Sequence, residues 1–302
     1  MVSTVKDTGR DKIFVICTYI YVFLAFIIVA YPVVYMLSAS ISDPKLVSSG
    51  EMWLWPRGIT FDGYKRVFEN SSIWRGYGNT ILYTVVGTMI NLIVTLPAAY
   101  ALSRKDFAGR NFFMGMFMVT MFFGGGLVPS YLLIKNLGMV DTIWAIVIPS
   151  AASIWNIIVS RTFFQSTIPS ELQEAAQIDG CTNMRLFFQI VLPLSMPIIA
   201  VMGLFYGVGN WNSYFSALIY LNDENKFPLQ LILRQILVLQ EMSAQPGGSM
   251  DATTALALNN KAEVAALVKY AVIIVATLPI IAIYPFLQRY FVQGVMIGSV
   301  KG

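Results

Sequence analysis

Six apolar stretches, each long enough to cross a lipid bilayer, constrain the fold more than any other feature. They are Ile13–Ser38, Tyr77–Ser103, Phe112–Ile134, Ile143–Ser160, Met196–Leu221 and Ala266–Leu287. A spanning helix needs roughly 20 apolar residues. The whole chain is 57% hydrophobic and 12% charged, whereas about a quarter of the residues in a water-soluble globule are charged. We therefore predict an all-α integral membrane protein with six kinked transmembrane helices.

The first stretch is preceded by Lys6, Arg10 and Lys12, as a signal peptide would be. It is too long for the apolar region of a signal peptide and ends without a small-residue cleavage site, so we predict a retained span. The two cysteines, Cys17 and Cys181, fall in different predicted compartments, which excludes a disulfide framework. The formal net charge of +4 is spread along the chain, so nucleic-acid binding is excluded as well.

Basic residues in short loops predict the orientation, because such loops stay on the cytoplasmic side. The tightest group is Arg104, Lys105 and Arg110, between spans two and three. Six spans then place both termini inside. The prediction divides the chain into a cytoplasmic N-terminus (1–12), a first span with its outer loop (13–76), a transmembrane core (77–287) with a cytoplasmic loop (168–193), and a cytoplasmic C-terminal tail (288–302).

A second outer stretch, Phe227–Met242, is rich in Leu and Ile and contains one arginine. This composition predicts a short helix at the membrane interface. The run Gln245–Ser249 then predicts a loop. This loop is expected either to contact an external partner or to act as a lid.

Prolines and glycines occur at several places within the predicted spans. Each span contains a proline or begins beside one: Pro32, Pro97, Pro129, Pro149, Pro197, Pro279 and Pro285. We interpret them as bends around a path that opens and closes, although proline is also simply commoner in membrane helices. The run Gly124–Gly126 fits either a hinge or a close helix crossing, and Gly203 with Gly207 forms a small-xxx-small pair. For both features we favour helix packing.

The chain lacks the groups that most chemistry requires. It has no histidine, no phosphate-binding loop and no cysteine pair at metal-ligand spacing, so nucleotide hydrolysis and metal chemistry must belong to another chain. A proton-driven carrier normally holds acidic residues or histidine within the membrane, but the only charge in the six stretches is Lys269. This argues against proton coupling and predicts a neutral solute.

Uncharged polar residues occur within the stretches. The candidate substrate path consists of Asn156, Asn210, Trp211, Asn212 and Tyr214. Amides can bind sugar hydroxyls, and aromatic rings can pack on the apolar face of a sugar. The alternative is that these amides bond neighbouring helices to one another. We prefer that alternative for Asn91 and leave both interpretations open for the cluster from Asn210 to Tyr214.

The polar segment after span four predicts a short helix. Ser170 and Gln173 fit a capping box, and Gly180 fits the position just past the helix end, so the helix should run from Glu171 to about Asp179. One face would present Leu172, Ala175, Ala176 and Asp179 to another surface. A second helix should start near Thr182 and end at Pro193.

This segment resembles the EAA loop of ABC importer permeases. The matching residues are Glu174, Ala175, Ala176, Gly180, Ile190, Val191, Leu192 and Pro193. The resemblance implies that the predicted helix is a cytoplasmic coupling helix between spans four and five, seated in a cleft of a partner ATPase. It implies ATPase-coupling roles for Glu174, Ala175, Ala176, Asp179, Gly180, Leu192 and Pro193.

The C-terminal sequence Tyr284–Gly294, followed by Gly298–Gly302, is similar to that of the second permease subunit in maltose-type oligosaccharide importers. There the tail implies a further ATPase contact, here through Ser299, Val300, Lys301 and Gly302. With Leu54–Pro56 and Gly124–Pro129, the resemblance covers nearly the whole chain. These stretches favour the branch serving complex plant or host oligosaccharides.

The resemblance implies a multi-pass subunit of the bacterial cell membrane, in contact with lipid and not an enzyme itself. The implied partners are a second permease, two cytoplasmic ATPase subunits that bind ATP and Mg, and an extracellular solute-binding protein. An ion-coupled sugar carrier, a membrane enzyme and a non-transporting regulatory subunit are the alternatives. An ATPase that stays bound in detergent would exclude the carrier, and vesicle uptake would exclude a regulatory subunit.

Overall fold

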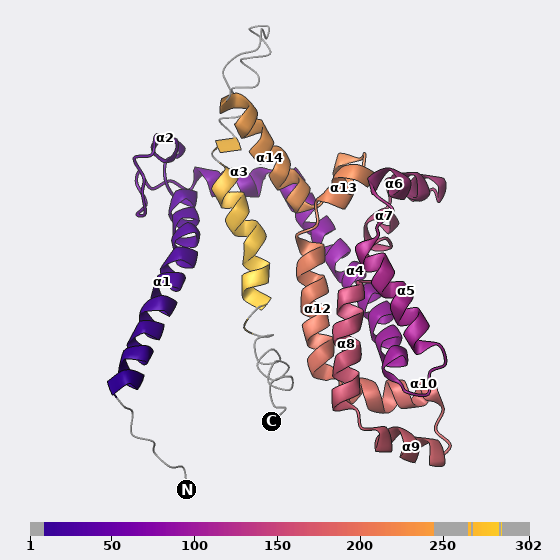
Figure 1. The fold of residues 1–302 in the computed structure, drawn as a ribbon. Helices are drawn as coiled ribbons and strands as arrows, with labels where there is room; N and C mark the ends of the chain where they lie inside the picture. The colour runs from indigo at the N-terminus through magenta and orange to yellow at the C-terminus, as the bar shows by residue number, and fades with distance from the viewer. Residues whose placement is uncertain (1–8, 245–264, 267, 284, 286–302) are drawn as a thin grey trace. The chain divides into compact units, whose positions relative to one another are not determined.

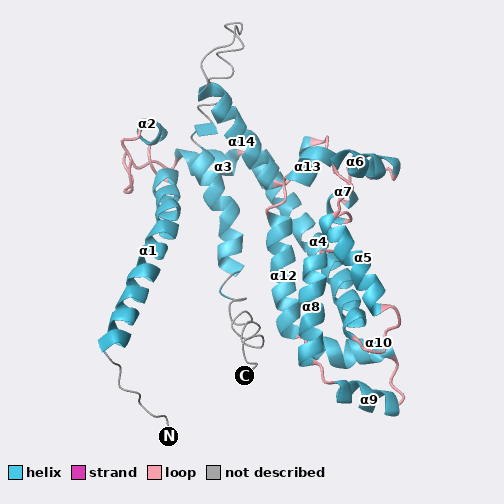
Figure 2. Cartoon of the chain, viewed as in Figure 1, coloured by secondary structure: helices cyan, strands magenta, loops and turns pink. Residues whose placement is uncertain are grey.

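The computed structural model describes residues 9–244, 265–266, 268–283 and 285 (Figure 1). Every regular element among them is a helix, as the colouring of Figure 2 shows. The prediction of an all-α chain is therefore confirmed for the described residues. The predicted loop Gln245–Ser249 and the tail residues Ser299–Gly302 lie outside them.

The chain divides into two compact units. The first contains Met1–Asn70 and Ile236–Val275, and the second contains Ser71–Gln235 and Ala276–Gly302. In the first unit, α1 (Gly9–Ser40) continues as one helix through Pro32, and its apolar window is exposed along its length. Lipid is the solvent that such a surface requires, because water would order around it at a cost in free energy.

Two short helices follow α1 in the first unit, α2 (Pro44–Ser48) and α3 (Asp62–Glu69). Asp43 caps α2 by accepting a hydrogen bond from the backbone N–H of Lys45. Val47 and Met52 pack against Ala39 near the end of α1. The predicted outer loop thus has a small core of its own.

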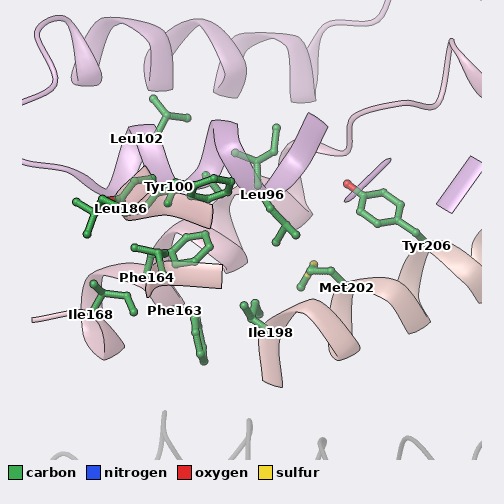
Figure 3. Close-up of a cluster of buried hydrophobic side chains, with 14 of the residues drawn as sticks. Leu96, Tyr100, Leu102, Phe163, Phe164, Ile168, Leu186, Ile198, Met202 and Tyr206 are labelled. Atoms are coloured by element: carbon green, nitrogen blue, oxygen red, sulfur yellow. The ribbon is translucent and has the colours of Figure 1, made fainter. Parts of the chain in front are cut away.

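The second unit is built on α4 (Ser71–Ser103), which packs against α8 (Ile154–Thr167) and α12 (Met196–Trp211). Buried positions recur along α4 every three or four residues, which is the spacing of one helix face. They include Ile73, Gly76, Thr80, Tyr83, Gly87, Asn91 and Thr95. Towards the Ser103 end, α4, α8 and α12 meet in an aromatic and aliphatic core (Figure 3).

The third predicted span is broken. It consists of α5 (Arg110–Phe122) and α6 (Leu127–Asn136), which meet at an angle of 112°. Gly126 has φ +81°, and no heavy atom lies within 4 Å of a Cβ built on Gly124 or Gly125. The glycines therefore form a backbone break, and our packing interpretation is wrong for them. Three adjacent glycines cost too much backbone entropy to remain helical without close contacts.

The fourth and fifth predicted spans are also discontinuous. The fourth consists of α7 (Trp144–Val147) and α8, separated by the non-helical residues 148–153 around Pro149. The fifth consists of α12 and α13 (Phe215–Tyr220), separated by residues 212–214. Both predicted spans are therefore interrupted rather than only kinked, because apolarity reports burial in a membrane and does not report helical continuity.

In the described residues, α1 and α4 are each long and apolar enough to cross a membrane. Two bent pairs, α5 with α6 and Asn183–Leu194 with α12, raise the number of candidate spans to four. The helix Val268–Ile283 is apolar but shorter. The count of six spans stays a prediction.

The predicted outer helix corresponds to α14 (Leu229–Ala244), which follows the short 3-10 helix η2 (Glu224–Lys226). Leu229 and Leu231 are buried, and the backbone N–H of Leu229 donates to Thr80 Oγ1 on α4 at 2.8 Å. The start of this helix is therefore packed on α4 rather than held only by lipid.

Candidate functional site

The helix α9 (Ser170–Ile178) lies at the predicted coupling position. Pro169 occupies the cap position, and no side chain caps the helix. The predicted capping box on Ser170 is therefore wrong, because Ser170 is already the first helical residue. The extended backbone of Pro169, with ψ at 145°, leads the chain into the helix instead.

The other end of α9 is closed by backbone hydrogen bonds. Gly180 has φ +70°, and its N–H donates to the carbonyl of Gln177 at 3.0 Å. The N–H of Cys181 donates to the carbonyl of Ala176 at 2.9 Å. These two bonds form a Schellman motif, which confirms the position predicted for Gly180. A Cβ at Gly180 would meet nothing within 4 Å, so glycine is required by the backbone and not by packing.

The predicted contact face of α9 is split between two sides. Leu172 and Ala176 pack into the core, whereas Glu174 and Ala175 are exposed. Ile178 is 87% exposed. Our assignment of Leu172 and Ala176 to the contact face is therefore wrong, because these two residues are one helical turn apart and both face the core formed with α4, α8 and α12.

Ile178 was not among the residues predicted from the sequence. The exposed surface of α9 includes Glu174, Ala175 and Ile178. The exposure of Ile178 could have been predicted from the sequence, because Ile178 does not lie on the helix face that Leu172 and Ala176 form.

After α9 the chain forms α10 (Asn183–Leu186), the π-helical turn η1 (Phe187–Val191) and α11 (Leu192–Leu194). Thr182 caps α10 by accepting the N–H of Arg185 at 3.3 Å, so the predicted start is confirmed. The predicted end at Pro193 is wrong, because the wider π turn accommodates the proline and helical structure continues to Leu194.

A group of side chains, which we term the Arg104 clasp, joins the Ser103 end of α4 to α10. Arg104 is 8% exposed. Its Nε and Nη2 atoms donate to Asp106 at 2.8 and 2.5 Å, and its Nη1 atom donates to Asn183 Oδ1 at 2.8 Å. The hydrogen bond from Arg104 lowers the pKa of Asp106 below its ordinary value.

The same end of α4 is bonded to two other side chains, both from α8. Arg161 Nε and Gln165 Nε2 donate to the carbonyls of Leu102 and Ser103 at 3.0 and 3.4 Å. A helix C-terminus leaves its last carbonyls without partners and favours nearby cations. The last turn of α4 has no basic residue of its own. Arg161 and Gln165 therefore provide the hydrogen-bond donors, and Arg161 the positive charge, at this helix end.

A second group, which we term the Asp141 clasp, lies near the Ser71 end of α4. Asp141 has φ +60°. Its Oδ1 atom accepts the N–H groups of Asn222 and Asp223, both at 3.1 Å, and Lys226 Nζ donates to Oδ2 at 2.5 Å. The Lys226 ammonium, and then these N–H groups, lower the pKa of Asp141 to about 2.

The side chains of α4 hold the same turn. Asn79 Nδ2 donates to the carbonyl of Asn225 at 2.7 Å, and the Tyr83 hydroxyl donates to the carbonyl of Lys226 at 2.8 Å. Both acceptors are backbone groups. The turn from 222 to 227 is therefore bonded both to Asp141 and to α4.

Midway along α4, two asparagines connect the helices. Asn210 Nδ2 donates to Asn91 Oδ1 at 3.0 Å and to Thr88 Oγ1 at 3.3 Å. Asn91 Nδ2 donates to the carbonyl of Ser150, within the non-helical segment 148–153, at 2.5 Å. The interhelical role predicted for Asn91 is confirmed, and Asn210 shares it.

The remaining candidate path residues differ in access. Trp211 is buried and donates from Nε1 to the carbonyl of Ala276 at 3.0 Å. Asn156 is also buried, at the start of α8. Asn212 and Tyr214 are exposed, with Arg234 Cζ at 5.3 Å from the Tyr214 ring centre. Asn212 and Tyr214 are therefore the members of the set that present accessible side chains.

A cavity of about 690 Å³ separates α9 from the loop 104–110. Glu171 and Glu174 line it on the α9 side, and Lys105 and Arg110 line it on the other. In the part of the chain that the structure describes, no group of three or more His, Cys, Asp or Glu side chains could hold a metal ion.

Residues 71–297 match the family described as the binding-protein-dependent transport system inner membrane component. The chain belongs to this family. Protein LplC of Bacillus subtilis (strain 168) is 39% identical over 301 residues, which cover 100% of this chain and 99% of that protein. The polygalacturonan/rhamnogalacturonan transport system permease protein YtcP of the same strain is 37% identical, over 97% of this chain and 100% of its own length.

A solved structure agrees with this assignment. It is the crystal structure of a bacterial ABC transporter involved in the import of the acidic polysaccharide alginate. The chain that matches has a TM-score of 0.81 and 33% sequence identity, over 94% of this permease and 99% of that chain. The permease is thus a transport subunit of a bacterial ABC importer in the inner membrane, and the ATPase is a separate partner.

Proposed function

We propose that this permease forms half of the translocation path for an oligosaccharide, and that α9 is the coupling helix through which a partner ATPase drives the path. The proposal includes six spans, with the loop 168–193 and both termini in the cytoplasm. It keeps the predicted divisions at 1–12, 13–76, 77–287 and 288–302.

The proposed complex contains a second permease, two cytoplasmic ATPase subunits and an extracellular solute-binding protein. The ATPase subunits bind ATP and Mg. The coupling residues are Glu174, Ala175, Ala176, Asp179, Gly180, Leu192 and Pro193, and Ile178 joins them. Ala176 acts by packing α9 on the core rather than by contacting the ATPase. The tail residues Ser299–Gly302 are proposed as a second ATPase contact. Membership of the binding-protein-dependent family supports an assembly of these kinds of subunit.

The proposed cargo is a sugar. Relatives of this chain include the melibiose/raffinose/stachyose import permease protein MelC of Bacillus subtilis, 30% identical over 83% of this chain. The solved relative is involved in the import of an acidic polysaccharide, so the proposal of a neutral cargo rests only on the predicted spans, in which Lys269 is the one charge. Among the candidate path residues, we propose Asn212 and Tyr214 as the sugar contacts, while Asn156, Asn210 and Trp211 shape the path.

One observation carries the coupling proposal. α9 ends in a Schellman motif at Gly180 and leaves Ile178 almost fully exposed. A bare isoleucine on a short polar helix is unfavourable in water and becomes favourable when a partner covers it. An isolated helix of this length is also marginal, so docking would stabilise it.

Two nearly isosteric substitutions at Gly180 test the proposal. Leucine at φ +70° is strained by roughly 1–2 kcal/mol, whereas asparagine tolerates the left-handed region. We expect Gly180→Leu to leave assembly with the ATPase intact but to reduce uptake by proteoliposomes, and Gly180→Asn to retain most uptake. Neither substitution meets a clash at its first side-chain atom, because no heavy atom lies within 4 Å of the added Cβ.

The measurements are co-purification of the ATPase in detergent, and sugar uptake together with ATP hydrolysis in proteoliposomes with the binding protein. Equal uptake by the leucine variant, the asparagine variant and the unmodified chain would contradict the role of α9. Failure of any ATPase to co-purify with the unmodified chain would contradict the proposed assembly itself.

A further inference from the structure

The segments on both sides of α9 are bonded to the same end of α4. On the preceding side, Arg161 and Gln165 of α8 donate to its last carbonyls at 3.0 and 3.4 Å. On the following side, Arg104 donates to Asn183, the first residue of α10, at 2.8 Å. The Ser103 end of α4 is therefore the point at which both attachments of α9 meet.

These two attachments are not equivalent. The α8 attachment ends on backbone carbonyls, which α4 presents whatever its sequence. The polar part of the α10 attachment joins two side chains and depends on Arg104, which is 8% exposed; beside it, the Phe187 ring packs on Tyr100 of α4. Asp106 accepts hydrogen bonds from Nε and Nη2 and so fixes the orientation of the guanidinium plane. A planar guanidinium held in this way positions its Nη1 group with little freedom.

The cavity of about 690 Å³ lies between α9 and the loop 104–110. Across this cavity a displacement of α9 does not act on the loop directly. It can reach α4 through the core that Leu172 and Ala176 share with Tyr100 and Leu102, and through the hydrogen bond between Asn183 of α10 and Arg104.

From its middle, α4 holds the other helices of the proposed path. Asn91 and Thr88 contact Asn210 of α12, and the Thr95 and Tyr206 hydroxyls lie 2.7 Å apart. A displacement of α4 along its axis would therefore move α12, or break its hydrogen bonds to α4, at the depth of the proposed path.

We propose that Arg104 is a positioning residue for transport, which ties the coupling segment to α4 through Asn183. This inference rests on the proposed function of α9. Arg104 contacts neither substrate nor nucleotide in this role. It makes α10 and α4 move together when the ATPase displaces α9.

Asn183→Ala tests the inference with little risk to folding. Asn183 is exposed, and the substitution leaves the Arg104–Asp106 pair intact. Asn183→Asp is the matched rescue variant, because a carboxylate keeps the acceptor and adds an opposite charge. Lys105→Gln is the control for a change of side chain and loss of a charge at a neighbouring exposed position. The complex is reconstituted in proteoliposomes with its ATPase and binding protein, and sugar uptake and ATP hydrolysis are measured together.

We expect Asn183→Ala to lower the sugar transported per ATP hydrolysed by roughly fivefold or more, while hydrolysis itself stays within about twofold. Asn183→Asp and Lys105→Gln should retain the ratio of the unmodified complex. Arg104→Gln with Asn183→Ala should be no worse than the more impaired single variant, because both remove one contact.

A proportional fall of uptake and hydrolysis in Asn183→Ala would overturn the inference, because a purely structural defect lowers both. An unchanged ratio would overturn it as well. Neither result affects the proposed role of α9, which the Gly180 pair of variants tests independently.

Discussion

The two clasps hold opposite ends of one helix by different means. At the Asp141 clasp, most of the bonds involve backbone groups of a tight turn, and the one close ion pair is partly exposed, with Asp141 at 29% and Lys226 at 40%. At the Arg104 clasp, the bond between segments joins two side chains and depends on one buried guanidinium. The first arrangement distributes its bonds over many groups, and the second concentrates them in one residue.

This difference matters for a helix that is proposed to transmit motion. Bonds to backbone carbonyls persist through most substitutions, so the Asp141 clasp should act as a fixed point. A bond between two side chains breaks and reforms by rotamer changes, without rearranging the backbone. The Arg104 clasp is therefore the end where small sequence changes should have large effects.

The largest expected effect is at Arg104. Arg104→Gln removes a buried charge together with at least two of its hydrogen bonds, and such bonds contribute about 1.5–3 kcal/mol each before compensation. We expect a net loss of about 2–3 kcal/mol in the free energy of unfolding, measured on the detergent-solubilised complex. Lys105→Gln is the control. Equal stability of Arg104→Gln and Lys105→Gln would show that the Arg104 clasp does not depend on this one side chain.

At the Asp141 clasp the largest effect should come from the backbone. Asp141 has φ +60°, where a β-branched residue is strained by about 1–2 kcal/mol and asparagine is not. We expect Asp141→Val to lower the thermal midpoint of the complex clearly and Asp141→Asn to lower it little, since the amide oxygen still accepts the two N–H groups. If the asparagine variant is as unstable as the valine variant, then the negative charge of Asp141 is essential. The hydrogen bonds to backbone groups would then contribute less to the Asp141 clasp than we infer.

Acid should weaken the Asp141 clasp, whose carboxylate is held by an ammonium and two backbone N–H groups. Its pKa is lowered from 3.8 to about 2, mainly by Lys226 and then by the N–H groups of Asp223 and Asn222. A carboxyl group whose pKa falls on folding stabilises the folded state above its unfolded pKa, and this stabilisation is lost as the pH falls through the folded value. In chemical unfolding at pH 5 to 2, the difference between the unmodified chain and Asp141→Asn should therefore shrink as the pH approaches 2. If the difference in the free energy of unfolding does not change with pH, then the pKa of Asp141 is the same in the folded and unfolded chain.

The smallest expected effect is at Lys226. The pair it forms with Asp141 is accessible to solvent, and exposed ion pairs contribute little and are screened by salt. We expect Lys226→Gln to change the thermal midpoint by less than about 2 °C, and the change to vanish in high salt. A larger change in the thermal midpoint that persists in high salt would show that the fold depends on the Lys226 side chain as it is expected to depend on Arg104.

Much of this fold follows from simple rules of sequence. α1 and α4 were predictable because long apolar stretches with a single proline each favour one helix in a membrane. Gly180 was predictable because a helix end with a left-handed residue is a local requirement. The breaks at 124–126, 148–153 and 212–214 were not predictable from apolarity, because a broken span and a continuous one bury the same residues. Of the three breaks, those at 124–126 and 148–153 had a local signal, in the three consecutive glycines and in Pro149.

The site was less predictable than the fold. Arg104 stood out in the sequence only as a loop charge for orientation, because its partner Asn183 is far along the chain and nothing local marks the pair. Asn210 and Trp211 were considered as path residues, but which amide faces a path and which faces a neighbouring helix depends on helix rotation. The exposure of Ile178 could have been inferred from its position on α9, on a different side of the helix from Leu172.

The π turn at Phe187–Val191 amounts to one extra residue inserted into an otherwise helical rod. The N–H of Leu192 reaches back to the carbonyl of Phe187, five residues earlier. Deleting one residue here would restore the ordinary winding and rotate the helix before the turn by about 100° relative to the helix after it. Asn183 would then turn away from Arg104 although every partner residue is still present. For this segment the chain length is constrained more tightly than the identity of any side chain, so we expect a single-residue deletion to be tolerated less well than a substitution.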